Sequence, residues 1–180
     1  MRRSKVLLVD DNPHSLDLMA QVLRGFRVGE TITCRSADEA REAVTTQSFD
    51  LLIIDGEMPG EDGISLTLSI RSEPKLPNFT TPIVFVSAYT PIDKVERARD
   101  AGANLVVKKP IAPAILLSRI EWLARQTRDF VKADGYCGPD RRFKNKPPPD
   151  GEPERRANAI ALTADMDRKM SQDDIDALFG

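Results

Sequence analysis

A chain of 180 residues, 41% hydrophobic and 30% charged, has room for one substantial hydrophobic core and a short appendage. Its formal net charge of −2 gives no overall basic field, so we expect neither nucleic acid nor an anionic membrane as a partner. No stretch is long and apolar enough to span a bilayer, and Cys34 and Cys137 lack metal-ligand spacing. We therefore expect a cytoplasmic protein with reduced thiols.

Short β-rich runs alternate with helical patterns up to about residue 133, which indicates parallel β-α-β units. The capping-box pattern Ser36-Ala-Asp-Glu39 indicates that a helix begins at Ser36. In chain order, the predicted strands are Lys5–Val9, Val28–Cys34, Asp50–Ile54, Pro82–Val86 and Leu105–Lys108. The predicted helices are Ser15–Arg24, the one opening at Ser36, Ile64–Arg71, Pro91–Ala101 and Pro113–Ala133.

Chemically active side chains stand where these strands end. Asp10 and Asp11 follow the first strand, Asp55 follows the third, Ser87 the fourth and Lys109 the fifth. The carboxyl ends of parallel strands meet at one edge of a sheet, so we expect these groups to converge. Two carboxylates ~4 Å apart repel by about 4 kcal/mol at an effective dielectric constant near 20. A cluster of three carboxylates therefore favours a hard divalent cation, and Mg²⁺ suits such a site.

The same residues carry a family resemblance. Over about residues 5–132, the chain resembles the receiver domain of two-component response regulators. The matching motifs are Asp10-Asp11, Asp55-Gly-Glu-Met58-Pro59 with Asp62-Gly63, Ser87-Ala88, and Lys109-Pro110. The resemblance implies a doubly wound α/β fold of the flavodoxin-like type, with five parallel strands in the order 2-1-3-4-5.

The resemblance also implies roles for the site residues. Asp55 would be phosphorylated from the phosphohistidine of a partner histidine kinase or phosphotransfer protein. Asp11, Asp55 and the Glu57 carbonyl would hold Mg²⁺, with Asp10 contributing through water. Ser87, the Ala88 N–H and Lys109 would bind the phosphoryl oxygens, and Lys109 would precede a cis proline.

One position departs from the family pattern. Many receivers carry an aromatic residue three positions before the lysine, and its rotamer follows phosphorylation, but Val106 stands there. The signal would then leave through the backbone or through Tyr89. We hypothesise that Tyr89 partly screens the phosphoryl group and, with Glu57, sets its lifetime.

The region after residue 133 has a different composition. Residues 134–158 are rich in proline and arginine and poor in apolar residues, which is typical of a flexible linker. Residues 159–180 are predicted to contain a short helix whose Ile175, Leu178 and Phe179 form an apolar stripe. This segment resembles the receiver-binding motif at the N-terminus of flagellar motor switch proteins. It would dock on its own receiver or recruit another protein.

Because few residues of this sequence follow the predicted fifth helix, we expect no DNA-binding or catalytic output domain. We therefore predict a single-domain response regulator, a phosphorylation-controlled binding switch in chemotaxis or motility, with a flagellar motor or chemotaxis protein as candidate target. It would not be an enzyme beyond self-catalysed acceptance and loss of the phosphoryl group. Two alternatives stay open. One is a constitutive adaptor whose receiver fold does not switch; the other, less favoured, is a phosphohydrolase that uses an aspartyl-phosphate.

Overall fold

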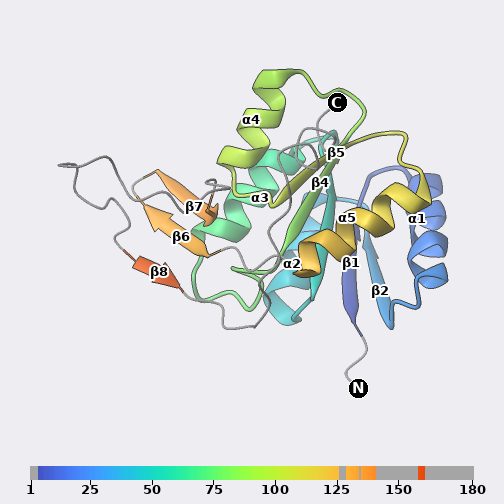
Figure 1. The fold of residues 1–180 in the computed structure, drawn as a ribbon, viewed down its shortest axis with the longest axis horizontal. Helices are drawn as coiled ribbons and strands as arrows, with labels where there is room; N and C mark the ends of the chain where they lie inside the picture. Colours follow the sequence, from blue (N-terminus) through green and yellow to red (C-terminus); the bar gives the residue numbers. More distant parts are fainter. Residues whose placement is uncertain (1–3, 126–128, 134, 141–157, 161–180) are drawn as a thin grey trace.

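The computed structural model describes residues 4–125, 129–133, 135–140 and 158–160 of the chain, and residues 158–160 are described by their backbone only. Strands and helices alternate through the first 125 residues, and short strands follow (Figure 1). The strands are β1 (Lys5–Val9), β2 (Glu30–Cys34), β3 (Leu51–Asp55), β4 (Ile83–Ser87), β5 (Leu105–Lys108), β6 (Phe130–Ala133), β7 (Tyr136–Pro139) and β8 (Asn158–Ile160). The helices are α1 (Pro13–Gly25), α2 (Ala37–Thr46), α3 (Gly63–Ser72), α4 (Ile92–Asp100) and α5 (Pro113–Arg125).

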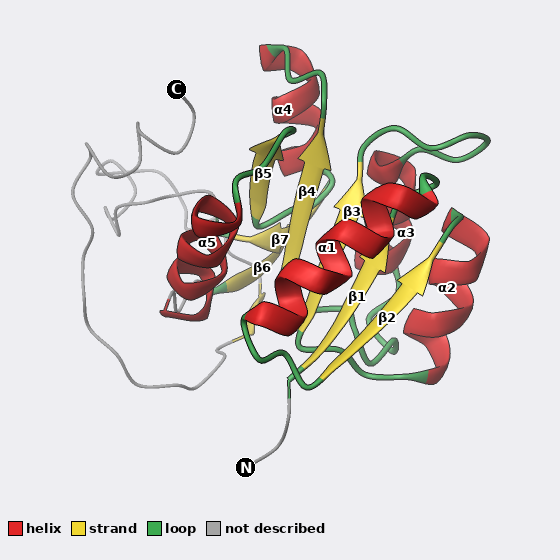
Figure 2. Cartoon of the chain, turned by 90° about the vertical axis from the view of Figure 1, so that its right-hand side faces the viewer, coloured by secondary structure: helices red, strands yellow, loops and turns green. Residues whose placement is uncertain are grey.

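A five-stranded parallel sheet forms the centre of the molecule, in the order β2-β1-β3-β4-β5. Helices α1 and α5 cover one face, and α2, α3 and α4 cover the other (Figures 1 and 2). The two hydrophobic clusters lie between the sheet and these helix layers, so β3 and β4 are buried along their whole length. The predicted doubly wound fold and strand order are confirmed.

The predicted elements agree with the structure to within a few residues at most boundaries. The Ser36 hydroxyl accepts a hydrogen bond from the Glu39 N–H at 3.2 Å and begins α2, as the capping pattern predicted. Helix α1 begins earlier than expected, because the Asn12 side chain accepts from the N–H groups of His14 and Ser15.

The end of the fifth helix was predicted wrongly. Helix α5 ends at Arg125, and Phe130–Ala133 forms β6 instead of helix. Its antiparallel partner β7 comprises Tyr136–Pro139, which the sequence placed in a flexible linker. Strand β8 pairs with the other edge of β6 and makes a second, three-stranded sheet. The predicted domain boundary at residue 133 therefore falls inside a β-hairpin.

The β6–β7 hairpin packs beside α3 and α4 (Figure 1). Phe130 is buried, and its ring lies 5.2 Å from that of Phe79. It covers Arg71 of α3, whose side chain is only 2% exposed. The Arg71 guanidinium donates to the carbonyls of Gly102, Phe79 and Thr81, at 3.2, 2.6 and 2.8 Å.

Burial lowers the pKa of Arg71 to about 10, which still leaves the guanidinium charged at neutral pH. The Arg71 guanidinium therefore connects α3 to the segments that precede β4 and β5, and the β6–β7 hairpin covers it. Within the part of the chain that the structure describes, no helix is long and apolar enough to cross a membrane.

Candidate functional site

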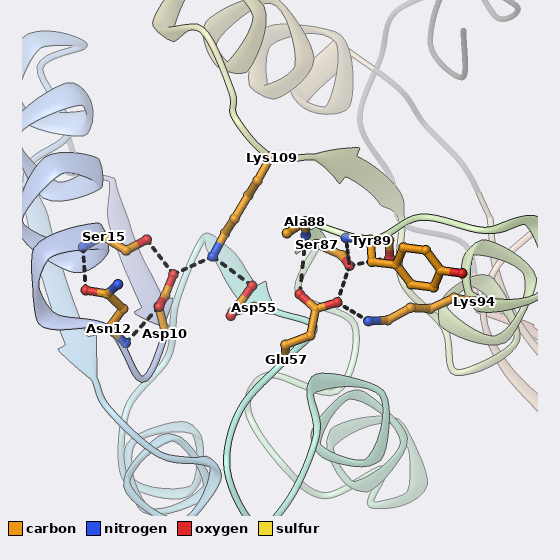
Figure 3. A network of polar contacts seen from close by, with 10 residues as sticks. All are labelled: Asp10, Asn12, Ser15, Asp55, Glu57, Ser87, Ala88, Tyr89, Lys94 and Lys109. Atoms are coloured by element: carbon orange, nitrogen blue, oxygen red, sulfur yellow. Dashed lines mark hydrogen bonds and ion pairs between the residues drawn. The ribbon is translucent and has the colours of Figure 1, made fainter.

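The carboxyl ends of β1 and β3 bring the predicted acidic residues together. Asp10, Asp11 and Asp55 each offer a carboxylate oxygen, and these oxygens lie within 4.8 Å of one another. Asp10 and Asp55 are buried, whereas Asp11 is partly exposed. Asp10 is held by the Ser15 hydroxyl at 2.6 Å and by the Asn12 N–H at 2.9 Å, so α1 fixes its orientation (Figure 3).

Lys109 reaches this cluster from the loop after β5. Its Nζ lies 2.7 Å from Asp10 Oδ2 and 2.8 Å from Asp55 Oδ1, so it bridges the two carboxylates (Figure 3). Burial disfavours the ammonium, but hydrogen bonds to Asp10 and Asp55 hold the pKa of Lys109 above its ordinary value. The peptide bond from Lys109 to Pro110 is cis, as predicted.

The negative charge around Asp55 favours the binding of a metal ion. Burial first, and then the charges of Asp10 and Glu57, raise the pKa of Asp55 although Lys109 opposes them. One ammonium thus leaves the negative charge of this cluster incompletely compensated. Carboxylate oxygens at this spacing are the ligands that Mg²⁺ prefers, so the residues fit the predicted ion.

The Glu57 side chain lies between Asp55 and α4 and accepts from several donors (Figure 3). Its Oε1 lies 2.7 Å from the Ser87 Oγ, and its Oε2 accepts from the Ala88 N–H at 3.3 Å. Oε1 also forms an ion pair with the Lys94 ammonium. Partial burial opposes ionisation, but the hydrogen bonds from Lys94, Ser87 and Ala88 keep the pKa of Glu57 below its ordinary value. Two of the three donors predicted for phosphoryl oxygens, Ser87 and the Ala88 N–H, are therefore engaged by this carboxylate, whereas Lys109 pairs with Asp10 and Asp55.

Tyr89 is placed differently from the sequence-based hypothesis. Its side chain is 70% exposed, and Figure 3 shows the ring pointing away from Asp55 toward the side of Lys94. Its carbonyl oxygen lies 2.7 Å from the Ser87 Oγ, so Tyr89 contacts the site through its backbone. Screening of a group on Asp55 would require rotation of the ring. Val106, at the usual aromatic position, is buried in β5 opposite Phe85.

Sequence reasoning missed two residues of this site, Ser15 and Lys94. Both stand in the first turn of a helix that follows a site strand, Ser15 in α1 and Lys94 in α4. A polar residue in the first turn after such a strand was the available signal, because that turn lies over the same sheet edge. A shallow groove of about 670 Å³ runs between the loop after β3 and the start of α4, lined in part by Glu57, Lys94 and Arg97.

The predicted apolar stripe of the tail (Ile175, Leu178 and Phe179) lies outside the described residues. The same is true of most of the predicted linker. The described site is thus formed by residues 10–109 alone.

Comparison with known proteins identifies the family to which the chain is similar. Residues 6–121 match the model of the response regulator receiver domain. Protein PetR of Rhodobacter capsulatus is 33% identical over 129 residues, which is 71% of this chain and 52% of that protein. The chemotaxis protein CheY of Pseudomonas aeruginosa is 30% identical over 117 residues, 65% of this chain and 93% of that protein. The match thus covers about half of PetR and nearly all of CheY.

Solved structures show the same fold. The chemotaxis protein CheY4 of Vibrio cholerae superposes with a TM-score of 0.62 at 26% identity, covering 67% of this chain and 98% of that one. A putative response regulator from Chloroflexus aurantiacus superposes with a TM-score of 0.63 at 29% identity, covering 69% and 100%. The β6–β7 hairpin lies beyond the residues that the family model matches.

Proposed function

Because the chain belongs to the response regulator receiver domain family, we propose that it accepts a phosphoryl group on Asp55 and acts as a phosphorylation-controlled binding switch. The observation that carries this proposal is the placement of Asp55 beside Asp10, Asp11 and Lys109 at one sheet edge. A phosphohistidine of a histidine kinase or phosphotransfer protein is the donor. The histidine nitrogen leaves with the electron pair of the N–P bond as an Asp55 carboxylate oxygen forms the new O–P bond.

The residues of this chain divide the work. Lys109 lies against Asp55 and would stabilise the charge of the transferred phosphoryl group. The Ser87 hydroxyl and the Ala88 N–H are the further donors, once they are released from Glu57. Asp10, Asp11, Asp55 and the Glu57 carbonyl are the proposed ligands of Mg²⁺, which when bound neutralises the carboxylates and the phosphoryl oxygens.

The outcome of phosphorylation is a change in binding and not multiple turnover. The protein would be an enzyme only in the sense that it catalyses its own phosphorylation and dephosphorylation, with Glu57 and Tyr89 setting the lifetime of the phosphoryl group. The similarity to chemotaxis proteins of Pseudomonas aeruginosa and Vibrio cholerae supports a role in chemotaxis or motility. A chemotaxis or flagellar motor protein is then the proposed target, and the segment with Ile175, Leu178 and Phe179 a proposed docking element.

The proposal is tested with the full chain, Mg²⁺ and acetyl phosphate. Intact-mass spectrometry should show one added phosphoryl group that hydroxylamine removes, as for an acyl phosphate. The Asp55→Asn variant should lose this adduct, whereas Asp17→Asn, an exposed aspartate of α1, should keep it. Chelation of Mg²⁺ should abolish labelling. An adduct that survives in Asp55→Asn, or steady release of phosphate over many turnovers, would contradict the proposal.

A further inference from the structure

The Glu57 carboxylate has the contacts expected of a phosphoryl group bound at this site. Its Oε1 lies 2.7 Å from the Ser87 Oγ, which the Tyr89 carbonyl oxygen also approaches to 2.7 Å, and its Oε2 accepts from the Ala88 N–H at 3.3 Å. Together with Lys109, Ser87 and Ala88 are the groups that donate to phosphoryl oxygens in the proposed function. A carboxylate is a planar pair of anionic oxygens and a phosphoryl group a pyramid of three, and both accept charge-assisted hydrogen bonds. The Glu57 carboxylate and a phosphoryl group cannot both accept from the Ser87 hydroxyl at once, because a hydroxyl has a single proton.

Lys94 holds Glu57 in this position from the other side. Its ammonium forms an ion pair with the same Oε1 that lies against Ser87, and its side chain is largely buried. Lys94 stands in the first turn of α4, and this helix begins after Pro91 without a side-chain cap. The ion pair is therefore a direct link between the loop after β3 and the start of α4.

We propose that Glu57 is an internal competitor of the phosphoryl group: its carboxylate occupies Ser87 and Ala88 in the unphosphorylated protein, and phosphorylation of Asp55 displaces it. Lys94 is the positioning residue that stabilises the occupied state and connects its loss to α4. This inference rests on the proposed function of Asp55 and deepens it, since it says what must leave before the phosphoryl group can be bound.

The surroundings allow such an exchange. The groove beside Glu57 is open, and Arg97 lines it one helical turn beyond Lys94, so a displaced carboxylate has a cationic neighbour to move toward. The exchange would also supply a route for the signal in a chain that carries Val106 where many receivers have an aromatic residue. The first turn of α4, including the exposed Ile92, would change its contacts when Glu57 leaves.

Occupancy and simple charge repulsion make different predictions for two variants of Glu57. Glu57→Gln removes the charge, whereas Glu57→Asp keeps the charge but shortens the reach by one methylene. If Glu57 competes by occupying the donors, both variants bind beryllofluoride more tightly than the wild type at saturating Mg²⁺. We expect a gain of about tenfold, since one charge-assisted hydrogen bond is lost from the competing state.

The experiment measures the dissociation constant of beryllofluoride for the full chain by calorimetry, with Glu61→Gln as the matched control. Glu61 lies in the same loop and pairs with Arg41, so its loss changes net charge equally without touching Ser87. Its affinity for beryllofluoride should equal that of the wild type. Tightening in Glu57→Gln alone would show charge repulsion and overturn the competitor, as would equal tightening in Glu61→Gln or no tightening in either Glu57 variant.

The link to α4 is measured by amide NMR on the same samples. In the wild type, beryllofluoride should shift the amides of Ile92 and Val95; Lys94→Met should lose most of this shift, and Lys94→Arg should retain it. Equal shifts in Lys94→Met would overturn the role of Lys94. Failure of the proposed function looks different, because then the wild type itself would not bind beryllofluoride and the amides near Asp55 would not move.

Discussion

The guanidinium of Arg71 lies 5.2 Å from the centre of the Phe130 ring, which closes over it. This contact joins α3 of the receiver fold to a hairpin that follows α5. A cation against an aromatic face contributes about 2 kcal/mol when both are desolvated. Because the other partners of Arg71 are carbonyl and amide oxygens of loops near β4 and β5, the hairpin completes the enclosure of a buried charge.

Removal of the aromatic ring should therefore destabilise the whole domain. We expect Phe130→Ala to lower the free energy of unfolding by about 3 kcal/mol, since it opens a cavity and exposes Arg71 to water. Lys132→Ala, on the same strand but exposed, should change it by less than about 0.5 kcal/mol. Urea unfolding of the two variants measures both values. Equal stability of Phe130→Ala and the wild type would show that the hairpin is not part of the folded core.

Gly102 provides a second test of the same interface. It has a φ of +99°, and a Cβ there would lie 2.4 Å from the Cys137 carbonyl oxygen of β7. Gly135, in the hairpin turn, has a φ of +79° with open space around it. Gly135→Ala should cost about 1 kcal/mol of unfolding free energy from backbone strain alone. Gly102→Ala should cost clearly more, because the hairpin must also move, and similar losses in urea titrations would argue against the close packing.

Lys109 pairs with Asp10 and Asp55, two of the carboxylates that would hold a metal ion, so we expect it to compete with that ion. Lys109→Met should strengthen Mg²⁺ binding about tenfold, or ~1.4 kcal/mol, because it removes a positive charge from Asp10 and Asp55. It should at the same time weaken the binding of beryllofluoride, which loses a donor. Calorimetric titration checks both, with Lys108→Met as control because Lys108 is exposed. Weaker Mg²⁺ binding in Lys109→Met would mean that Lys109 organises the metal ligands instead of competing.

The hypothesis that Tyr89 screens the phosphoryl group requires its exposed ring to move toward Asp55. If its exposed ring rotates over the phosphoryl group, Tyr89→Ala should shorten the lifetime of phospho-Asp55 several-fold, whereas Tyr89→Phe should leave it unchanged. Loss of the phosphoryl group after removal of the donor gives the lifetime. The hypothesis fails for both residues if neither Tyr89→Ala nor Glu57→Asn alters that rate.

Cys34 should make the stability depend on alkaline pH. Burial raises the pKa of the Cys34 thiol to about 11, with the charges of Glu39 and Glu42 adding to the effect. The unfolded thiol ionises near its ordinary value of 9.0. Its contribution is thus fully present below pH ~9 and is lost as the pH rises toward about 11.

Between about pH 8 and about pH 10.5 this loss should amount to about 2 kcal/mol of unfolding free energy. The same comparison in Cys34→Ala isolates it, because the other alkaline titrations remain in that variant. Identical pH profiles of the two proteins would exclude an effect of Cys34.

Much of the site could be predicted because it depends on strand ends. Asp10 follows a strongly apolar strand, and Asp55 and Ser87 each end one. A parallel sheet places such strand ends side by side whatever the details of packing. The cluster of carboxylates follows from that rule, whereas the doubly wound fold and its strand order were implied by the family resemblance. The hairpin could not be predicted in the same way. Phe130 and Val131 continue the apolar spacing of α5, and a short strand that contains glycine and proline resembles a linker in composition.

The sequence by itself determined the parallel β-α-β units and the residues at the carboxyl ends of the strands, because periodicity is a local property, and its family motifs implied the doubly wound strand order. Only the tertiary structure decided how the side chains there are partnered. Glu57 is 30 residues from Ser87 and 37 from Lys94, and Arg71 is 31 from Gly102. Partners this distant are chosen by the packing of whole elements, so the carboxylate on Ser87 and the ring over Arg71 become visible only in the folded chain.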